Sequence, residues 1–322
     1  MLRIAFRDFP GRFNPDKLLA LLKTRFEVQE VETDPEYVIH SVFGYSFLSE
    51  PEEAIRIAFI GENVRPDFNL SDYSFGFDWL EFDDRYYRAP NYILYPSFKS
   101  VIGGTPPLLR IPFGERTFCN FLYSNPNAHP MRDILFDRLQ RIGRVDSPGA
   151  HRRNMSSLAV PAYKSNWEEV AVEWQSNYRF SISVENSSTP GYSTEKVVNA
   201  LAAGTIPIYF GDPVLHRIFN PDRMINIHLT GLDNALKRVQ EINNNSELFA
   251  EVLRQPNFTN GKTPSNLSEE FILDAFERIF SQPIEVAIRR SRGSWGKRYE
   301  KRLLQALGPR STRFRLPFSR NR

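Results

Sequence analysis

The stretch from residue 178 to residue 213 constrains the fold more than any other part of this chain. Residues 178–184 are aromatic and β-branched, which predicts a buried strand. After a polar loop, apolar residues recur at helical spacing, namely Val197, Val198, Leu201 and Ala202. Gly204 stands where a left-handed residue ends a helix, and residues 206–209 predict the next strand. The stretch therefore predicts a β-α-β unit of a parallel sheet.

The start of the predicted helix carries residues suited to a nucleotide sugar. A helix that follows a parallel strand presents free N–H groups and a positive dipole end to an anion. In its first turn, Lys196 can place a cation beside a phosphate, and Glu195 can accept hydrogen bonds from two sugar hydroxyls. An ordinary β-α-β unit with a solvated first turn gives the same pattern, so the pattern alone leaves both interpretations open.

The same residues carry a resemblance to a known family. Glu-Asn-Ser at 185–187, Tyr-Ser-Thr-Glu-Lys at 192–196 and Thr-Ile-Pro-Ile-Tyr-Phe-Gly at 205–211 resemble the signature of the α-1,3/4-fucosyltransferases, glycosyltransferase family 10. Phe210 stands where this family has Trp or Tyr. The chain is similar to bacterial members in particular. The resemblance extends over about residues 55–285.

Strand and helix patterns alternate along the rest of the chain, and they begin again near residue 117. We expect an α/β fold of the GT-B type, with two Rossmann-like domains facing across a cleft and a basic C-terminal tail. The predicted ranges are an acceptor-binding domain at 1–114, a nucleotide-sugar donor-binding domain at 115–285 and a basic amphipathic segment at 286–322. Ligands of such sheets bind at the carboxyl ends of the strands.

Glu62 is the candidate general base. It follows a predicted strand at 55–60, so its carboxylate is expected at the mouth of the cleft. Glycosyl transfer with inversion needs one base to take the proton of the acceptor hydroxyl, although Gly-Glu-Asn is also common as a turn cap. The family has the same Gly-Glu-Asn, followed by an aromatic-Gly-Phe-Asp segment. The resemblance therefore implies that Glu62 is the base and that Asn63 and Asp78 lie on the acceptor side.

The donor side needs cations, because a departing nucleoside diphosphate gains negative charge. Arg153 and Lys196 are the candidates, and Arg can bind phosphate through two parallel hydrogen bonds. The sequence leaves open whether Arg152 or Arg153 enters the site. The family has Arg directly before Asn here, which favours Arg153. The resemblance makes Asn186, Tyr192 and Glu195 donor-contacting residues as well. Asn125 follows a predicted strand at 118–123 and is expected to border the donor site.

The resemblance implies an inverting fucosyltransferase. It would move L-fucose from GDP-β-L-fucose to the N-acetylglucosamine of a β-galactosyl-N-acetylglucosamine acceptor, as in Lewis antigens, lipopolysaccharide O-antigens and protein glycosylation. Whether the linkage is α1,3 or α1,4 stays open. Three alternatives also stay open: use of another nucleotide sugar, a glycoside hydrolase with Glu62 and Glu195 as paired carboxylates, and a non-enzymatic basic-tailed protein that binds nucleotide or membrane.

No metal site is predicted, because the five His residues lack ligand spacing and no Asp-x-Asp motif follows a strand. The resemblance implies that no cofactor is required, and it leaves open whether Mn²⁺ or Mg²⁺ stimulates the reaction.

Charge is distributed unevenly along the chain. Residues 289–322 hold twelve Lys and Arg and one Glu, whereas the remainder holds 29 basic and 37 acidic residues. Part of this tail can form a basic amphipathic helix, which is typical of membrane-surface segments. A solvated disordered tail or a nucleic-acid-binding segment has a similar composition, but we expect no nucleic-acid partner.

No apolar run approaches about 20 residues, and the first residues lack the apolar core of a signal peptide. We expect a cytoplasmic protein, peripheral on the inner membrane, where lipid-linked glycan acceptors are built.

Overall fold

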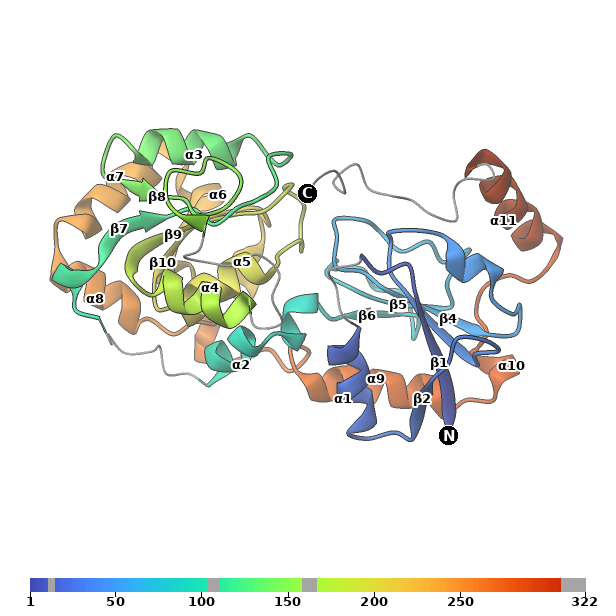
Figure 1. Ribbon diagram of the computed structural model, residues 1–322. Coiled ribbons are helices and arrows are strands. Elements are labelled where there is room, and N and C mark those ends of the chain that lie inside the picture. The colour runs from blue at the N-terminus through green and yellow to red at the C-terminus, as the bar shows by residue number, and fades with distance from the viewer. Residues whose placement is uncertain (11–14, 104–110, 158–166, 308–322) are drawn as a thin grey trace. The chain divides into compact units, whose positions relative to one another are not determined.

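A computed structural model describes residues 1–10, 15–103, 111–157 and 167–307 (Figure 1). The chain forms two units. The first unit contains Met1–Leu94 and Ser265–Arg322, of which the part up to residue 307 is described, and the second unit is Tyr95–Pro264. Each unit is built around one parallel sheet.

The first unit has a six-stranded parallel sheet with strand order β2-β1-β3-β4-β5-β6. The strands are β1 (Leu2–Arg7), β2 (Val28–Glu30), β3 (Tyr37–His40), β4 (Ile55–Phe59), β5 (Tyr73–Gly76) and β6 (Tyr86–Arg88). The central strands are buried along their whole length, as expected of parallel strands covered on both faces.

Two helices far apart in sequence pack in the first unit, α1 (Asp16–Lys23) and α9 (Glu269–Phe280). Aromatic rings join α9 to the sheet: Phe276 stacks on Phe75 at 4.7 Å between ring centroids, and Phe280 meets Tyr37 edge-on at 4.6 Å. The apolar face of α9 therefore completes the core of the first sheet.

The second unit has a five-stranded parallel sheet with strand order β11-β10-β9-β7-β8. The strands are β7 (Thr117–Asn120), β8 (Val145–Asp146), β9 (Tyr178–Val184), β10 (Ile206–Phe210) and β11 (Ile225–Asn226). The helices are α2 (Pro96–Ile102), α3 (Met131–Leu139), α4 (Trp167–Gln175), α5 (Glu195–Ala202), α6 (Ile227–Thr230), α7 (Leu232–Asn243) and α8 (Ser246–Arg254). Helices α3, α7 and α8 contribute to the core on one face, and α2, α4 and α5 pack together on the other (Figure 1).

Both sheets have the strand order of doubly wound α/β domains, in which the second strand lies outside the first. The order reverses between β1 and β3 in the first unit and between β7 and β9 in the second. Two Rossmann-like domains are thus present, as the sequence predicts. Ligands bind such sheets at the carboxyl ends of the strands beside this reversal.

The predicted β-α-β unit at 178–213 is present as β9, α5 and β10. Gly204 ends the helix with φ at +66°, which favours glycine because it has no Cβ. The N–H of Gly204 donates to Leu201 O at 3.0 Å, and that of Thr205 donates to Ala200 O at 3.1 Å. These two bonds form a Schellman motif that caps free carbonyls of α5. The prediction that Gly204 ends this helix is confirmed.

The structure divides the chain differently from the predicted ranges 1–114, 115–285 and 286–322. The first unit consists of two segments of the chain, one that ends at Leu94 and one that begins at Ser265. The reason is packing: α9 covers the first sheet, and α10 (Ile284–Ala287) and α11 (Ser294–Leu307) follow it there. The basic segment is therefore part of the first unit as far as residue 307, and residues 308–322 lie outside the described residues.

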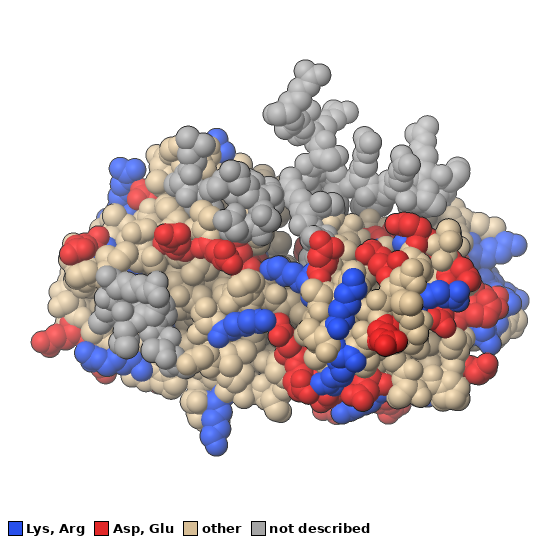
Figure 2. All heavy atoms as spheres, turned by 60° about the horizontal axis from the view of Figure 1, so that its bottom comes forward, with Lys and Arg blue, Asp and Glu red and all other residues tan. Residues whose placement is uncertain are grey.

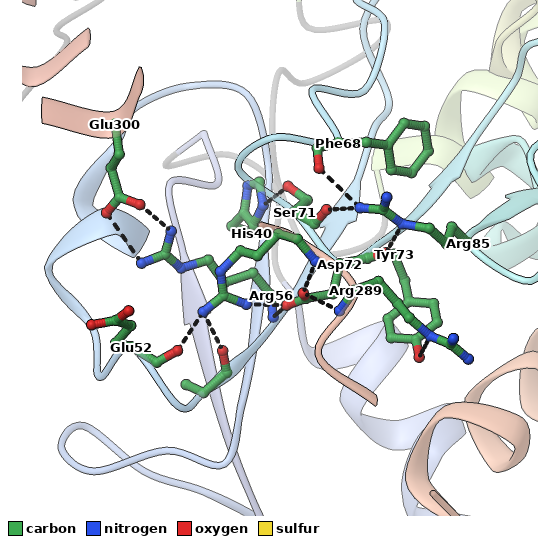
Figure 3. A network of polar contacts seen from close by, with 12 residues as sticks. His40, Glu52, Arg56, Phe68, Ser71, Asp72, Tyr73, Arg85, Arg289 and Glu300 are labelled. Atoms are coloured by element: carbon green, nitrogen blue, oxygen red, sulfur yellow. Dashed lines mark hydrogen bonds and ion pairs between the residues drawn. The ribbon is translucent and has the colours of Figure 1, made fainter. Parts of the chain in front are cut away.

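A buried carboxylate holds the returning chain (Figure 3). Asp72 has no exposed surface, and its Oδ1 accepts the backbone N–H groups of Arg289 and Arg290, both at 2.8 Å. Its Oδ2 accepts the backbone N–H of Arg56 at 2.8 Å and pairs with the Arg290 guanidinium. Further along, Glu300 of α11 pairs with Arg56 at 3.1 Å.

The outer face of α11 is cationic. Leu303 packs against the apolar cluster around Phe47 and Leu48 of the first unit, so this side of the helix is occupied. The remaining side exposes the cations Lys297, Arg298, Lys301 and Arg302 together with Trp295. Elsewhere acidic and basic side chains are interspersed over the face drawn in Figure 2.

Candidate functional site

Tyr123, in the loop after β7, binds the end of β9 and the loop after β8 in the second unit. Its hydroxyl donates to Ile182 O at 2.8 Å and accepts the N–H of Val184 at 2.7 Å, both on β9. Its carbonyl accepts the N–H of His151 from the loop after β8 at 3.0 Å. A Cβ on Gly149 would lie 2.1 Å from that carbonyl, so only glycine allows this approach. The loops after β7 and β8 and the end of β9 therefore meet at the reversal of the sheet.

Glu185, the first residue after β9, braces the start of α5. It is fully buried, and its two carboxylate oxygens accept hydrogen bonds from Thr194 N at 2.8 Å and Thr194 Oγ1 at 2.7 Å. A Cβ on Gly211 would lie 2.4 Å from Glu185 Cγ, so this glycine makes room for the carboxylate. Glu185 thus places a negative charge at the amino end of the helix, where the helix dipole favours it.

Lys196 lies between two carboxylates. Its Nζ is 3.1 Å from Glu185 Oε2, 2.9 Å from Thr194 Oγ1 and 3.4 Å from Glu195 Oε1. The Lys196 side chain is 17% exposed and that of Glu195 is 25% exposed, whereas Glu185 is enclosed. The two residues that the sequence assigns to the donor therefore lie together, and the solvent reaches both of them.

The pKa values at this centre follow from burial and charge. Burial raises the pKa of Glu185, and Lys196 opposes this effect. Burial alone lowers the pKa of Lys196, but the carboxylates of Glu185 and Glu195 outweigh it and hold that pKa well above its ordinary value. Burial raises the pKa of Glu195, but the charge of Lys196 and several hydrogen bonds outweigh burial. The pKa of Glu195 therefore lies below its ordinary value. Lys196 is therefore a fixed cation at neutral pH.

Arg132 joins two predicted donor residues. It is only 2% exposed, and its Nη2 donates to Asn186 Oδ1 at 2.8 Å and to Val184 O at 2.9 Å. Its Nη1 donates to Asn125 O at 3.2 Å, and its guanidinium lies 4.0 Å from the ring centroid of Tyr123. Arg132 of α3 thus holds Asn125 and Asn186 beside one another.

Tyr192 lies in the loop between Glu185 and α5 and is only 2% exposed. The same loop is fixed by Asp212, whose Oδ1 accepts the N–H of Gly191 at 2.8 Å. Ser188 Oγ also donates to Gly211 O at 2.7 Å. The Tyr192 side chain is therefore buried in the protein. Its contact with the nucleotide remains a prediction.

The two arginines of the loop after β8 have different surroundings. Arg152 has φ at +57°, and its guanidinium pairs with Asp133 at 2.9 Å and with both oxygens of Asp137 at 3.0 and 2.9 Å. Arg153 is exposed, and its Nε donates to the carbonyl of Gly149 at 3.2 Å. The acidic residues of α3 thus hold Arg152, which leaves Arg153 as the better candidate for a phosphate.

The predicted acceptor residues lie in the first unit. Glu62 follows β4 and is partly buried, and its carbonyl accepts the N–H of Val64 at 2.7 Å. Arg65 joins the other two: its Nη1 donates to Asn63 Oδ1 at 2.8 Å, and its Nη2 pairs with Asp78 Oδ1 at 2.8 Å. Burial raises the pKa of Asp78, and Arg65 and Arg88 oppose this effect.

Sequence reasoning missed three of these contacts. The hydrogen bonds from Glu185 to Thr194 were detectable only as the motif around both residues. The contacts Arg132–Asn186 and Arg65–Asp78 gave no signal, because each joins two different segments of the chain. Over the residues that the structure describes, no three His, Cys, Asp or Glu side chains are grouped as metal ligands. Over the same residues, no helix combines the length and the apolar character needed to span a membrane.

Two family models match the chain. The alpha-(1,3)-fucosyltransferase FucT N-terminal domain matches residues 4–95, and the glycosyltransferase family 10 (fucosyltransferase) C-terminal model matches residues 115–266. Alpha-(1,3)-fucosyltransferase FucT of Helicobacter pylori is 33% identical over 264 residues, which are 71% of this chain and 53% of FucT. Putative fucosyltransferase R654 of Acanthamoeba polyphaga mimivirus is 29% identical over 168 residues, 51% of this chain and 28% of R654. The chain thus spans about half the length of FucT and less of R654.

Solved structures agree with the family models. An alpha1,3-fucosyltransferase crystallised with GDP-fucose has a TM-score of 0.72 and 27% identity, covering 90% of this chain and 92% of that one. The crystal structure of alpha1,3-fucosyltransferase with GDP also has a TM-score of 0.72, with 26% identity over 91% of this chain and 93% of that one. The GT-B type of fold is thereby confirmed. The family models, the relatives and the fold agree that the chain belongs to glycosyltransferase family 10, the fucosyltransferases.

Proposed function

We propose that this protein is an inverting fucosyltransferase. It transfers L-fucose from GDP-β-L-fucose to the N-acetylglucosamine of a β-galactosyl-N-acetylglucosamine acceptor and forms an α1,3 or α1,4 linkage. One observation carries the proposal: the fixed cation Lys196 lies at the amino end of α5, beside the strand reversal of a sheet in a family 10 fold. The likeness to a structure that contains GDP-fucose supports the choice of donor.

Donor binding changes the contacts of Lys196. Three acceptor oxygens lie within 3.4 Å of its Nζ in this structure, and that of Glu195 is the farthest. Glu195 is also the more exposed of the two carboxylates. A phosphate oxygen therefore replaces Glu195 as the third acceptor, and the released carboxylate accepts the ribose hydroxyls. Glu185 keeps Lys196 and the helix in place throughout.

The other donor residues surround this exchange. Arg153 supplies a second cation to the diphosphate, and it is free of the acidic partners that hold Arg152. Asn125 and Asn186 border the nucleotide, oriented by Arg132. Tyr192 supports Lys196 from the enclosed side of the loop. Together the cations stabilise the charge that develops on the departing GDP.

Glu62 acts as the general base. Its carboxylate takes the proton of the acceptor hydroxyl while the oxygen attacks C1 of fucose. The C1–O bond to GDP breaks, and GDP leaves with the electron pair, so the β-linked donor gives an α-linked product. Asn63 and Asp78 contact the acceptor from neighbouring positions of the first unit, with Arg65 between them.

The test is transfer from GDP-fucose to two disaccharide acceptors, galactosyl-β1,3-N-acetylglucosamine and galactosyl-β1,4-N-acetylglucosamine. NMR of the product determines the linkage, and parallel reactions with EDTA, Mg²⁺ and Mn²⁺ measure the metal dependence. We expect a new α-fucosyl bond to N-acetylglucosamine. Turnover of another nucleotide sugar alone, cleavage of fucosides without donor, or GDP-fucose binding without transfer to either acceptor would each replace this proposal by one of its alternatives.

We also propose that α11 places the enzyme on anionic membrane surfaces in the cytoplasm. Its exposed side carries Lys297, Arg298, Lys301 and Arg302, and Trp295 is 73% exposed beside them. Each cation near an anionic surface contributes about 1 kcal/mol. Leu303 packs on the first unit, so binding would use the cations, Trp295 and the exposed Leu304.

The membrane proposal is tested by sedimentation with vesicles that contain anionic lipid. The variant R298E/K301E is expected to lower the bound fraction at least tenfold, since each reversal removes one attraction and adds one repulsion. Its solution activity should match that of the wild type. Equal binding of variant and wild type would exclude α11 as the contact.

A further inference from the structure

Arg88 has hydrogen-bonding capacity that no described residue of the chain uses. It is the last residue of β6 and is only 8% exposed. Among the residues that the structure describes, no partner faces its Nε or its Nη2. Buried donors without a partner are rare and cost about 1–3 kcal/mol each. These two N–H groups therefore call for an acceptor that the described residues do not supply.

The surroundings of Arg88 suit a sugar. Its guanidinium lies 4.0 Å from the ring centroid of Trp79, which is 40% exposed. Asp78 is nearby and 9% exposed, and its Oδ1 pairs with Arg65 at 2.8 Å. The group thus combines a cationic donor, a carboxylate that accepts hydroxyls and an exposed aromatic surface. Ligand sites commonly pair such aromatic surfaces with a few oriented polar groups.

Arg88 lies at the same edge of the sheet as Glu62. Strands β4, β5 and β6 are adjacent and parallel, and Gly76 of β5 pairs with Arg88 of β6. Neighbouring strands are about 4.8 Å apart, so the carboxyl ends of β4 and β6 are separated by about 10 Å. Glu62, three residues past the end of β4, and Arg88 are therefore within reach of one disaccharide.

We infer that Arg88, together with Asp78 and Trp79, forms a subsite for the acceptor saccharide and binds its carbonyl or carboxylate group. The Nε and Nη2 edge of a guanidinium donates two parallel hydrogen bonds, which match a carboxylate and can also converge on one carbonyl oxygen. Trp79 covers a face of the sugar, and Asp78 accepts its hydroxyls. The inference rests on the proposed function, because the ligand is the acceptor of that reaction.

The test is Arg88→Lys, which keeps the charge and removes the paired donors. We expect the KM for the acceptor to rise about tenfold or more, as the loss of one or two charge-assisted hydrogen bonds predicts. The KM for GDP-fucose and the Tm should stay at the wild-type values. Arg3→Lys, a matched change of a half-exposed arginine on β1, should change neither KM. An unchanged acceptor KM in Arg88→Lys would mean that water satisfies Arg88, and it would overturn the inference.

Two further acceptors distinguish the carbonyl from the carboxylate. If Arg88 binds the acetamido carbonyl, the variant loses its penalty on a disaccharide with glucose in place of N-acetylglucosamine. If Arg88 binds a carboxylate, the penalty is largest on an acceptor that carries an acidic sugar. A small, equal penalty on all acceptors contradicts both. Should the wild type fail to turn over GDP-fucose, saturation-transfer NMR of the same disaccharides with Arg88→Lys still tests the subsite separately from the reaction.

Discussion

The buried pair of Asp72 and Arg290 predicts that the C-terminal return of the chain stabilises the first unit (Figure 3). The side chains of Asp72 and Arg290 are 0% and 3% exposed. The Arg290 guanidinium also donates to the carbonyls of Glu52 at 2.6 Å and Ala54 at 3.1 Å. The perturbation is Arg290→Met, which keeps a long apolar side chain and removes every one of these donors.

The magnitude follows from burial. Removing one partner of a buried pair costs about 3–5 kcal/mol, because the other charge stays buried without compensation. Three backbone N–H groups still bind Asp72 in the variant, so we expect the lower end, about 3 kcal/mol. For a unit of this size, a loss of that order lowers the Tm by roughly 6–12 °C.

Differential scanning calorimetry and urea unfolding measure the loss. Arg298→Met is the matched control, since that guanidinium lies over the exposed ring of Trp295, and it should cost less than about 0.5 kcal/mol. Truncation after Ile288 should lower the stability at least as much as Arg290→Met. A loss in Arg290→Met no larger than in the control would refute the reasoning.

Three further changes test other parts of the structure. Lys196→Met should raise the Kd for GDP-fucose about tenfold or more by calorimetry, and an unaltered Kd would remove Lys196 from the phosphate site. Gly204→Ala should cost roughly 1–2 kcal/mol in urea unfolding because of its positive φ, and a neutral result would contradict the Schellman cap. Burial lowers the pKa of His40 to about 4, so the unfolded state binds more protons between about pH 6.5 and 4. Stability present above pH 6.5 should then fall by about 3 kcal/mol by pH 4, and His40→Gln should flatten this dependence.

The predictions from sequence succeeded where the determinants are close together in the chain. The unit at 178–213 shows this, because strand, helix and stop signal all lie within one stretch, and Gly204 adopts the expected left-handed conformation. Two Rossmann-like domains also followed from local patterns repeated along the chain. The placement of Glu195 and Lys196 together in the first turn of this helix was predictable for the same reason.

The predictions fell short where the partner comes from a distant segment. The apolar face of α9 is visible in the sequence, but nothing local says that Phe276 stacks on Phe75 in the first sheet. Arg289 and Arg290 were assigned to the basic amphipathic segment at 286–322, whereas Asp72 binds both of them. Arg88 gave no signal, because a missing partner can be recognised only in three dimensions.

The central claim is that Glu62 of the first unit takes the acceptor proton while Lys196 of the second holds the donor. Its most direct test measures GDP-fucose affinity and transfer rate in Glu62→Gln. We predict an unchanged Kd and a kcat reduced at least a hundredfold, the usual contribution of a general base. A variant that binds GDP-fucose and transfers fucose at the wild-type rate would contradict the account.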